Sequence, residues 1–267
     1  MLIHLNGALV SAAEARVDPA DRGLALGDGL FETIRARGGR PLRLAAHCAR
    51  LRAGADVLDL PVPVSDEALG RALEETLKAN AVTDGVLRLT LTRGPGPRGL
   101  LPPPRPRPTL LITAAAEASS PSPIRAVIAT TTRRNEHSPL SRCKCINYLD
   151  NILARLEAAK RGADDALLLN TAGRLAGTTI ANLFLVIDGA LVTPPVADGA
   201  LPGVMRGEVV KAAGAGERSL APEDLASASE AFVTNCLGIR ALVSVDGAPI
   251  GDGRPGAVAE RMQTLAP

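Results

Sequence analysis

Apolar and polar residues in the first half of the 267-residue chain alternate in short segments. Positions 86–92 have the period of two that is typical of a strand, 30–37 is also strand-like, and the apolar stretch 2–10 predicts two short strands on either side of Asn6-Gly7. Between these segments, apolar residues recur every three or four positions over 44–58 and 66–80, which predicts two helices. The first half is therefore expected to combine strands with helices.

Turn and capping residues separate these elements. Asn6-Gly7 and Gly38-Gly39 predict hairpin turns, because these residues accept the positive φ angles that such turns need. Asp21 to Gly23 predicts a loop, and Ser65 is expected to cap the helix that follows it. The proline-rich tract 102–108 is expected to be extended and outside the centre of any sheet.

The second half alternates strands and helices more regularly. Strands are predicted at 124–130, 166–170 and 183–187, and helices over about 148–161 and 203–213. This order of elements is typical of an α/β or α+β protein.

A change in composition divides the chain. Residues 116–123 are rich in Ala, Ser and Pro, which predicts a linker between two domains. We therefore expect a smaller N-terminal α/β domain over 1–115 and a larger C-terminal domain over 124–267. The length is sufficient for two domains that each have a core.

Composition and charge narrow the possible partners. The formal net charge is only +2, so the bulk electrostatics do not favour nucleic acid or a membrane surface. The sequence has neither a secretory leader pattern nor an apolar segment of the ~20 residues that a membrane helix needs. A cytoplasmic protein that acts on small molecules is expected.

The four cysteines do not predict a disulfide framework or a metal site. Cys143-x-Cys145, with His137 nearby, does not have the spacing of a usual zinc site, and a fourth ligand is missing. No metal is expected.

Lys144 and Tyr148 are the most informative pair of residues. The chain has only one tyrosine, and it follows one of four lysines by four positions. A lysine amine can condense with the aldehyde of pyridoxal phosphate, and a phenol can donate a hydrogen bond to the ring oxygen of that cofactor. The alternative is that Lys144 is an ordinary solvated charge.

Several motifs in the right order extend this interpretation to nearly the whole chain, which resembles the fold-type IV pyridoxal phosphate enzymes. That family includes branched-chain and D-amino-acid aminotransferases and 4-amino-4-deoxychorismate lyase. The resemblance implies a two-domain subunit with the cofactor at the domain interface, and a homodimer. The motifs are Asp21 to Thr33, His47 to Leu51, Arg93 to Gly99, Lys144 to Asn151, Asn182 to Phe184, Leu201 to Arg206, and Thr234-Asn235.

The resemblance also implies roles for individual residues. Lys144 would bind the cofactor covalently and move the substrate proton, and Tyr148 would contact the cofactor ring. Arg50 would bind the phosphate through its planar guanidinium. Two substrate positions of the family are occupied here by Phe31 and Arg98.

The remaining cofactor positions suit a phosphate group and a ring. The turn before a predicted helix can offer free backbone amides to a phosphate, and small hydroxyl residues can donate hydrogen bonds to it. Each of these residues could instead serve only its own turn or helix. The predicted set is Gly203, Val204 and Met205, with Thr178, Thr179, Thr234 and Asn235.

Gly177 departs from the family pattern. In the resembling enzymes a glutamate at this position faces the pyridine nitrogen and keeps it protonated. Loss of that carboxylate should impair transamination more than a lyase reaction, because formation of an aromatic ring drives the lyase reaction.

Three functions therefore remain open from the sequence. The first is a 4-amino-4-deoxychorismate lyase, which forms 4-aminobenzoate and pyruvate and would act in folate biosynthesis. The alternative is an aminotransferase that moves an amino group between a branched-chain or other small amino acid and a 2-oxo acid. The third is a protein that binds pyridoxal phosphate without efficient turnover.

Overall fold

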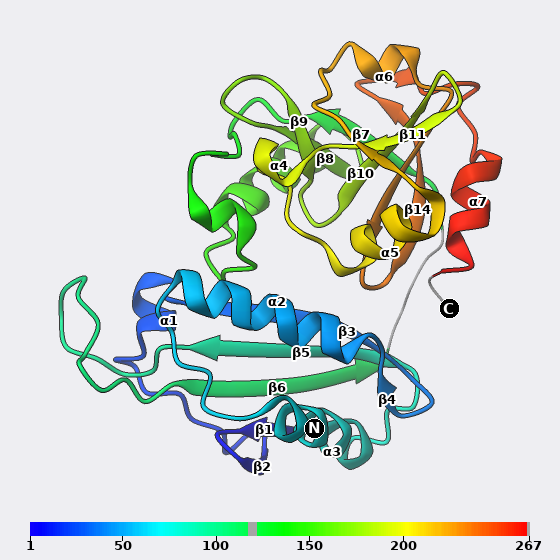
Figure 1. The fold of residues 1–267 in the computed structure, drawn as a ribbon. Helices are drawn as coiled ribbons and strands as arrows, with labels where there is room; N and C mark the ends of the chain where they lie inside the picture. Colours follow the sequence, from blue (N-terminus) through cyan, green and yellow to red (C-terminus); the bar gives the residue numbers. More distant parts are fainter. Residues whose placement is uncertain (117–121, 266–267) are drawn as a thin grey trace. The chain divides into compact units, whose positions relative to one another are not determined.

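The structure, a computed structural model, describes residues 1–116 and 122–265 (Figure 1). The chain forms two compact units. Unit 1 contains the residues before the undescribed segment together with Cys143–Asn147, and unit 2 contains the rest. The predicted linker 116–123 lies largely outside the described residues, so its bounds stay a prediction.

Unit 1 is built on a six-stranded antiparallel sheet in the order β2-β1-β6-β5-β3-β4. Both predicted hairpin turns are confirmed, with φ values of 51° and 94° at Asn6-Gly7 and 56° and 74° at Gly38-Gly39. The strands are β1 Leu2–Leu5, β2 Ala8–Ser11, β3 Gly29–Arg37, β4 Arg40–Pro41, β5 Gly85–Thr92 and β6 Thr109–Ala116.

Three helices accompany this sheet: α1 Arg22–Leu26, α2 Leu44–Val57 and α3 Asp66–Ala79. The predicted cap of α3 is confirmed, since the Ser65 hydroxyl accepts a hydrogen bond from the Ala68 amide at 3.3 Å. The loop predicted at Asp21 to Gly23 is wrong. The Asp21 carboxylate accepts from the Gly23 amide at 2.7 Å and caps the short helix α1 instead.

The core of unit 1 follows from the periods in the sequence. Alternate residues of β5, Leu87, Leu89 and Leu91, are buried against the helices, and Leu69 and Leu73 of α3 are buried at helical spacing. Each such leucine contributes about 2 kcal/mol relative to an exposed position. This core fixes which faces of β3 and β5 point away from the helices.

Unit 2 contains a nine-stranded mixed sheet in which β12-β11-β10-β13-β14-β7-β8-β9 are neighbours and β15 pairs with β14. The pairs β7–β8, β7–β14 and β11–β12 are parallel. The strands are β7 Ile124–Ile128, β8 Asp165–Leu169, β9 Leu175–Thr178, β10 Asn182–Ile187, β11 Ala190–Thr193, β12 Gly216–Glu217, β13 Glu230–Asn235, β14 Gly238–Val245 and β15 Ala248–Pro249.

The helices of unit 2 are α4 Leu149–Lys160, α5 Val204–Ala213, α6 Asp224–Ser227 and α7 Ala257–Gln263, with 3-10 turns η1 Pro139–Arg142 and η2 Val196–Asp198. All residues of β8 and β10 are buried, which explains their continuous apolar sequences. Phe184 and Phe232 stack with ring centroids 5.0 Å apart between the sheet and α5. Among the described residues, no helix is long and apolar enough to span a membrane.

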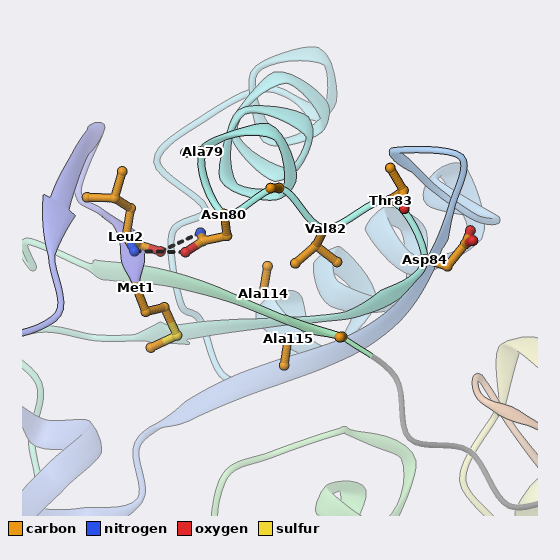
Figure 2. A pocket seen from close by; sticks show the side chains of 11 residues that line it. Met1, Leu2, Ala79, Asn80, Val82, Thr83, Asp84, Ala114 and Ala115 are labelled. Carbon is orange, nitrogen blue, oxygen red and sulfur yellow. Dashed lines mark hydrogen bonds between the residues drawn. The ribbon is translucent and has the colours of Figure 1, made fainter.

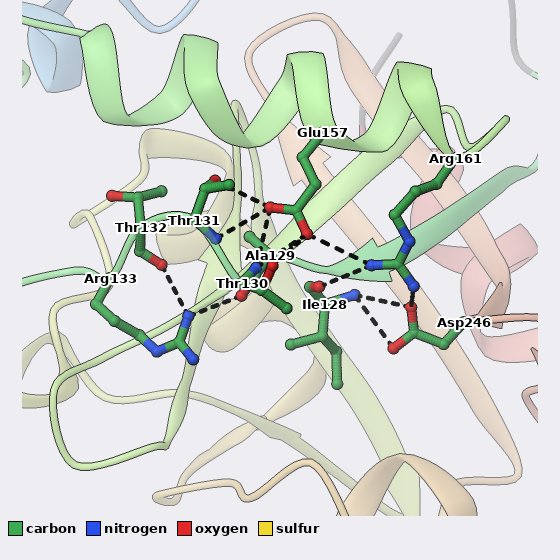
Figure 3. A network of polar contacts seen from close by, with 9 residues as sticks. All are labelled: Ile128, Ala129, Thr130, Thr131, Thr132, Arg133, Glu157, Arg161 and Asp246. Carbon is green, nitrogen blue, oxygen red and sulfur yellow. Dashed lines mark hydrogen bonds and ion pairs between the residues drawn. The ribbon is translucent and has the colours of Figure 1, made fainter.

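Glu157 joins the end of α4 to the chain that leaves β7 (Figure 3). Its carboxylate accepts hydrogen bonds from the amides and hydroxyls of Thr130 and Thr131, at 2.9 to 3.1 Å. Burial alone would raise the pKa of Glu157, but these hydrogen bonds outweigh it and lower the pKa to about 2. Arg161 extends the network to Asp246, 2.5 Å away.

Asp28, just before β3, forms ion pairs with two buried arginines. Its carboxylate lies 2.8 Å from Nε of Arg22 and 2.7 Å from Nε of Arg93. Burial would raise the pKa of Asp28, but the hydrogen bonds from Arg93 and Arg22 outweigh it and hold the pKa below its usual value. The ionised form is therefore the one that the folded protein stabilises.

We expect Asp28→Asn to lower the free energy of unfolding by about 3 kcal/mol at neutral pH, because it leaves two buried guanidinium groups without their anion. The folded-state pKa lies below the unfolded value of about 3.9, so this stabilisation is present above that pH and disappears as the pH falls through the folded-state pKa. Urea unfolding at neutral pH and at about pH 3 should show the difference between the two proteins shrinking in acid. Asp56→Asn, at an exposed position of α2, is the control, and a pH-independent difference would contradict the assignment.

Candidate functional site

Lys144 lies on an extended segment of unit 1 that runs beside the start of β3. The Phe31 amide donates to the Lys144 carbonyl at 2.9 Å, and the Ile146 amide donates to the Gly29 carbonyl at 3.0 Å. Cys143 and Cys145 on either side are buried in the core of unit 1. Since successive side chains of an extended segment point to opposite faces, the core directs the lysine side chain away from itself.

Phe31 connects Lys144 to a second cationic group. Nζ of Lys144 lies 4.3 Å from the centroid of the Phe31 ring, and Cζ of Arg88 lies 4.0 Å from it. The two cationic groups are therefore no further apart than the sum of these distances, about 8 Å. Such contacts are worth about 0.5 to 1 kcal/mol each at exposed sites.

The sequence motifs did not identify Arg88 as a candidate site residue. It lies on β5, where Leu87 and Leu89 on either side are buried and Arg88 itself is exposed. The feature of the sequence that could have indicated it is a charged residue in the middle of a strand of alternating apolar residues. Only the pairing of β3 with β5 shows that this arginine lies against the predicted substrate residue Phe31.

Arg50 is held by a buried carboxylate. Glu32, which is 1% exposed, accepts from Nε and Nη2 of Arg50 at 2.8 and 2.5 Å, and lies 2.7 Å from Nδ1 of His47. Burial would raise the pKa of Glu32, but the hydrogen bonds from His47 and Arg50 outweigh it and hold the pKa below its usual value. The carboxylate thus orients the guanidinium that was predicted to bind phosphate, and that role stays a prediction.

Arg98 lies on the exposed loop that follows β5. Arg22 supports the next part of this loop, because its guanidinium donates to the carbonyls of Gly99 and Leu100 at 2.9 and 2.7 Å. The predicted substrate contact of Arg98 stays a prediction.

In unit 2, the start of α5 and the end of β13 meet at Asn182. Gly203 caps α5, and a Cβ atom at this position would lie 2.0 Å from Oδ1 of Asn182, so a larger residue would displace the Asn182 side chain. Thr234 is the β13 partner of Asn182 in the sheet register. The first amides of α5, at Val204 and Met205, have no acceptor within an α-helix and can bind an anion.

Thr234 carries a buried hydroxyl that needs a partner. The residue is 1% exposed, and its Oγ1 atom has no hydrogen-bond partner among the described residues. An unsatisfied buried polar group costs about 1 to 3 kcal/mol, which a phosphate oxygen would offset. The neighbouring Asn235 uses its Oδ1 to accept from the Leu237 amide at 2.9 Å.

Thr178, the last residue of β9, and Thr179 begin a tight turn that is closed by a hydrogen bond from the Thr178 amide to the Ala181 carbonyl. Oγ1 of Thr178 accepts from the Ala181 amide at 3.1 Å and keeps its own proton available to donate. The Thr179 hydroxyl instead donates to Asp165 at 2.5 Å. Gly177, just before the turn, has a φ of 148°, and a Cβ atom there would lie 2.9 Å from the Ala181 carbonyl oxygen.

Tyr148 is the residue at which α4 begins, and it is half-buried in unit 2. The structure therefore groups the predicted residues in two sets. Unit 1 brings together Lys144 and Phe31, with Arg50 held by Glu32 on the same strand as Phe31. Unit 2 carries Tyr148, Thr178, Thr179, Gly203, Val204, Met205, Thr234 and Asn235.

A separate hollow in unit 1, of about 730 Å³, lies where the end of α3 meets the start of β1 and the end of β6 (Figure 2). Asn80 joins its walls by exchanging two hydrogen bonds with the backbone of Leu2, at 2.8 and 2.7 Å. The hollow contains none of the predicted site residues. Its lining consists of Met1, Leu2, Ala79 to Asp84, and Ala114 to Ala116.

Each unit carries groups that suit one part of pyridoxal phosphate. The aldehyde of the cofactor requires an amine, and Lys144 of unit 1 carries one. Its phosphate requires hydrogen-bond donors, and in unit 2 the Thr234 hydroxyl, which has no partner among the described residues, and the glycine-capped start of α5 are groups of this kind.

Comparison with known proteins identifies the family of the chain. Residues 29–245 match the family model for amino-transferase class IV. A provisionally named branched-chain-amino-acid aminotransferase of Methanocaldococcus jannaschii is 34% identical, over 98% of this chain and 94% of the relative. The D-alanine aminotransferase of Bacillus licheniformis is 29% identical, over 99% and 95%.

Solved structures give the same result. The branched-chain aminotransferase of the archaeon Thermoproteus uzoniensis, solved with norvaline, superposes with a TM-score of 0.92 at 30% identity, covering 100% of this chain and 93% of that one. A provisionally named 4-amino-4-deoxychorismate lyase from Legionella pneumophila superposes with a TM-score of 0.86 at 30% identity, covering 95% of each. A further branched-chain amino acid aminotransferase of this fold was solved with pyridoxamine 5'-phosphate. The two-unit mixed α/β fold is thus that of the fold-type IV enzymes, and the chain belongs to the class IV aminotransferases, a family of enzymes that depend on pyridoxal phosphate.

Proposed function

We propose that this enzyme is an aminotransferase that moves the amino group of a branched-chain or other small amino acid to a 2-oxo acid. The observation that carries the proposal is the placement of Lys144 and Arg88 against the same ring of Phe31. The lysine can hold the cofactor aldehyde and move the proton at the substrate α-carbon, and the arginine can bind a carboxylate at a distance suited to a small molecule. An amino acid and a 2-oxo acid both carry the carboxylate that this pair requires.

Lys144 and Arg88 each have a defined role in the proposed reaction. Pyridoxal phosphate, when bound, supplies the aldehyde that takes up the amino group and a ring that accepts electrons. Lys144 holds the cofactor through its amine and then moves the proton at the α-carbon of the substrate. Arg88 pairs with the substrate carboxylate and so orients the α-carbon toward the lysine.

The phosphate of the cofactor would be bound by preformed donors. Thr234 would donate its hydroxyl, and the amides of Val204 and Met205 would donate from the start of α5. Arg50 would add a positive charge whose orientation Glu32 fixes. Tyr148 would donate to the ring oxygen of the cofactor.

Relatives support an aminotransferase more broadly than a lyase. Branched-chain and D-alanine aminotransferases are among the curated relatives that align over nearly the whole chain. The lyase predicted first from the sequence remains a second candidate, supported by the Legionella structure and by Gly177. The positive φ of Gly177 and the close Ala181 carbonyl mean that a glutamate could not be restored there without local rearrangement.

The visible absorption of the cofactor-loaded enzyme tests the proposal. L-Leucine or L-glutamate should convert the absorption to that of the pyridoxamine form, and a 2-oxo acid should restore it. Lys144→Ala should lower the rate by about a thousand-fold or more, because it removes the group that moves the proton. Lys160→Ala, at an exposed position, is the matched control.

D-Alanine, tested in parallel, decides which enantiomer the enzyme accepts. If no amino donor changes the absorption while 4-amino-4-deoxychorismate is converted to pyruvate, the aminotransferase proposal is wrong and the lyase is supported.

Arg88→Gln tests the carboxylate contact. Loss of a charge-assisted hydrogen bond worth about 1.5 to 3 kcal/mol should raise the KM for the amino acid about 10- to 100-fold. The Kd of 4-methylvalerate, which has the carboxylate but no amine, should rise by a similar factor. Arg37→Gln, at an exposed position of β3, is the control, and an unchanged KM and Kd in the Arg88 variant would exclude this contact.

A further inference from the structure

Four residues of unit 2 form a ring of polar contacts between α4 and the turn after β9. Nδ2 of Asn151 donates to the Thr179 carbonyl at 2.6 Å, and the Thr179 hydroxyl donates to Oδ1 of Asp165 at 2.5 Å. Nη1 of Arg155 lies 3.3 Å from the same Asp165 oxygen. Asn151 and Arg155 are four positions apart on α4 and so share one face of the helix, which closes the ring.

Three of the four members of the ring are buried. Asn151 is 8% exposed, Asp165 is 3% exposed and Thr179 is 1% exposed. Oδ1 of Asp165 also accepts from the Ala166 amide at 2.8 Å, and loss of Asp165 would remove the acceptor of the buried Thr179 hydroxyl, at a cost of about 1 to 3 kcal/mol. The geometry of these residues is therefore strongly determined.

Apolar packing gives α4 little orientation of its own. Of its twelve residues, those that are buried are Ala154, Ala158 and Asn151. Leu149, Ile152 and Leu153 are 72%, 50% and 49% exposed. An alanine surface is small and smooth, so polar contacts fix the orientation of the helix. Glu157 and Arg161 hold its C-terminal end, and Asn151 and Arg155 hold its N-terminal half.

Tyr148 depends on that orientation. It occupies the N-cap position immediately before α4, and its side chain makes no capping hydrogen bond. Asn151 lies three positions later, less than one helical turn away. A change in the contact of Asn151 with the turn therefore moves the phenol relative to Thr178.

We propose that Asp165 is a positioning residue which, through Thr179, Asn151 and Arg155, fixes the Tyr148 phenol relative to the Thr178-Thr179 turn. The proposal rests on the proposed function, in which Tyr148 contacts the cofactor ring. Thr179 then acts by holding the helix, because its hydroxyl and its carbonyl are both engaged within the ring. Thr178 is left as the member of the pair with a hydroxyl proton to donate.

The composition of the chain provides a direct readout. Tyr148 is the only tyrosine, and the chain has no tryptophan. In the protein without pyridoxal phosphate, the near-ultraviolet circular dichroism of tyrosine and the ultraviolet titration of phenol ionisation therefore report on Tyr148. Both are measured on the full-length protein before the cofactor is added.

Asp165→Asn and Asn151→Ala should each change the Tyr148 dichroism and shift the phenol titration midpoint by at least about half a pH unit. They should also weaken retention of pyridoxal phosphate about 10-fold or more. Asp165→Glu, which keeps the charge, should restore part of the shift. Lys160→Gln, at an exposed position in the last turn of the same helix, is the control and should leave all three readouts unchanged.

Folded variants of Asp165 and Asn151 with the dichroism and titration midpoint of the wild type would overturn the proposal. Asp165→Asn is used because it keeps the shape of the side chain, and thermal unfolding checks that each variant is folded. If Asp165→Asn shifts the Tyr148 titration in a protein that transaminates no donor, the positioning role is supported and the proposed function is wrong.

Discussion

Two backbone hydrogen bonds between the Lys144 segment and the start of β3 set the geometry on which the rest of the site depends. They attach a segment from the middle of the sequence to the sheet of the N-terminal unit. Cys143 and Cys145 fill the core on one side of this segment, so Lys144 points to the other side and reaches the ring of Phe31. The direction of the Lys144 side chain thus depends on the burial of Cys143 and Cys145.

The turns of unit 2 are held by a different kind of contact. With few aromatic side chains available, unit 2 fixes its turns through buried polar groups that hold backbone atoms, as Asn182 does beside Gly203 and as Thr179 does beside α4. Such contacts are directional, whereas alanine and valine surfaces are not. Directional contacts are what a cofactor site requires, because its donors must be positioned to within fractions of an ångström.

The periodicity of the sequence predicted most of the long elements, and the hairpin turns, because strand, helix and turn preferences are local. Helix α1 was missed since it has only five residues and depends on one side-chain cap from Asp21. Sequence motifs predicted the other candidate site residues. They did not predict Arg88, because Arg88 comes to lie beside Phe31 only when β3 pairs with β5. The ring around Asp165 was equally invisible, since it joins residues from three separate elements.

The buried contact of Glu32 with His47 and Arg50 constrains how this sequence can vary. Replacement of the glutamate alone leaves a guanidinium in the interior without its anion, and replacement of the arginine alone leaves a buried carboxylate with only a histidine. Either single replacement destabilises the folded protein far more than a replacement of the whole group by well-packed apolar residues would. Glu32 and Arg50 are therefore expected to be inherited together or lost together, so that natural variants with one and without the other should be rare.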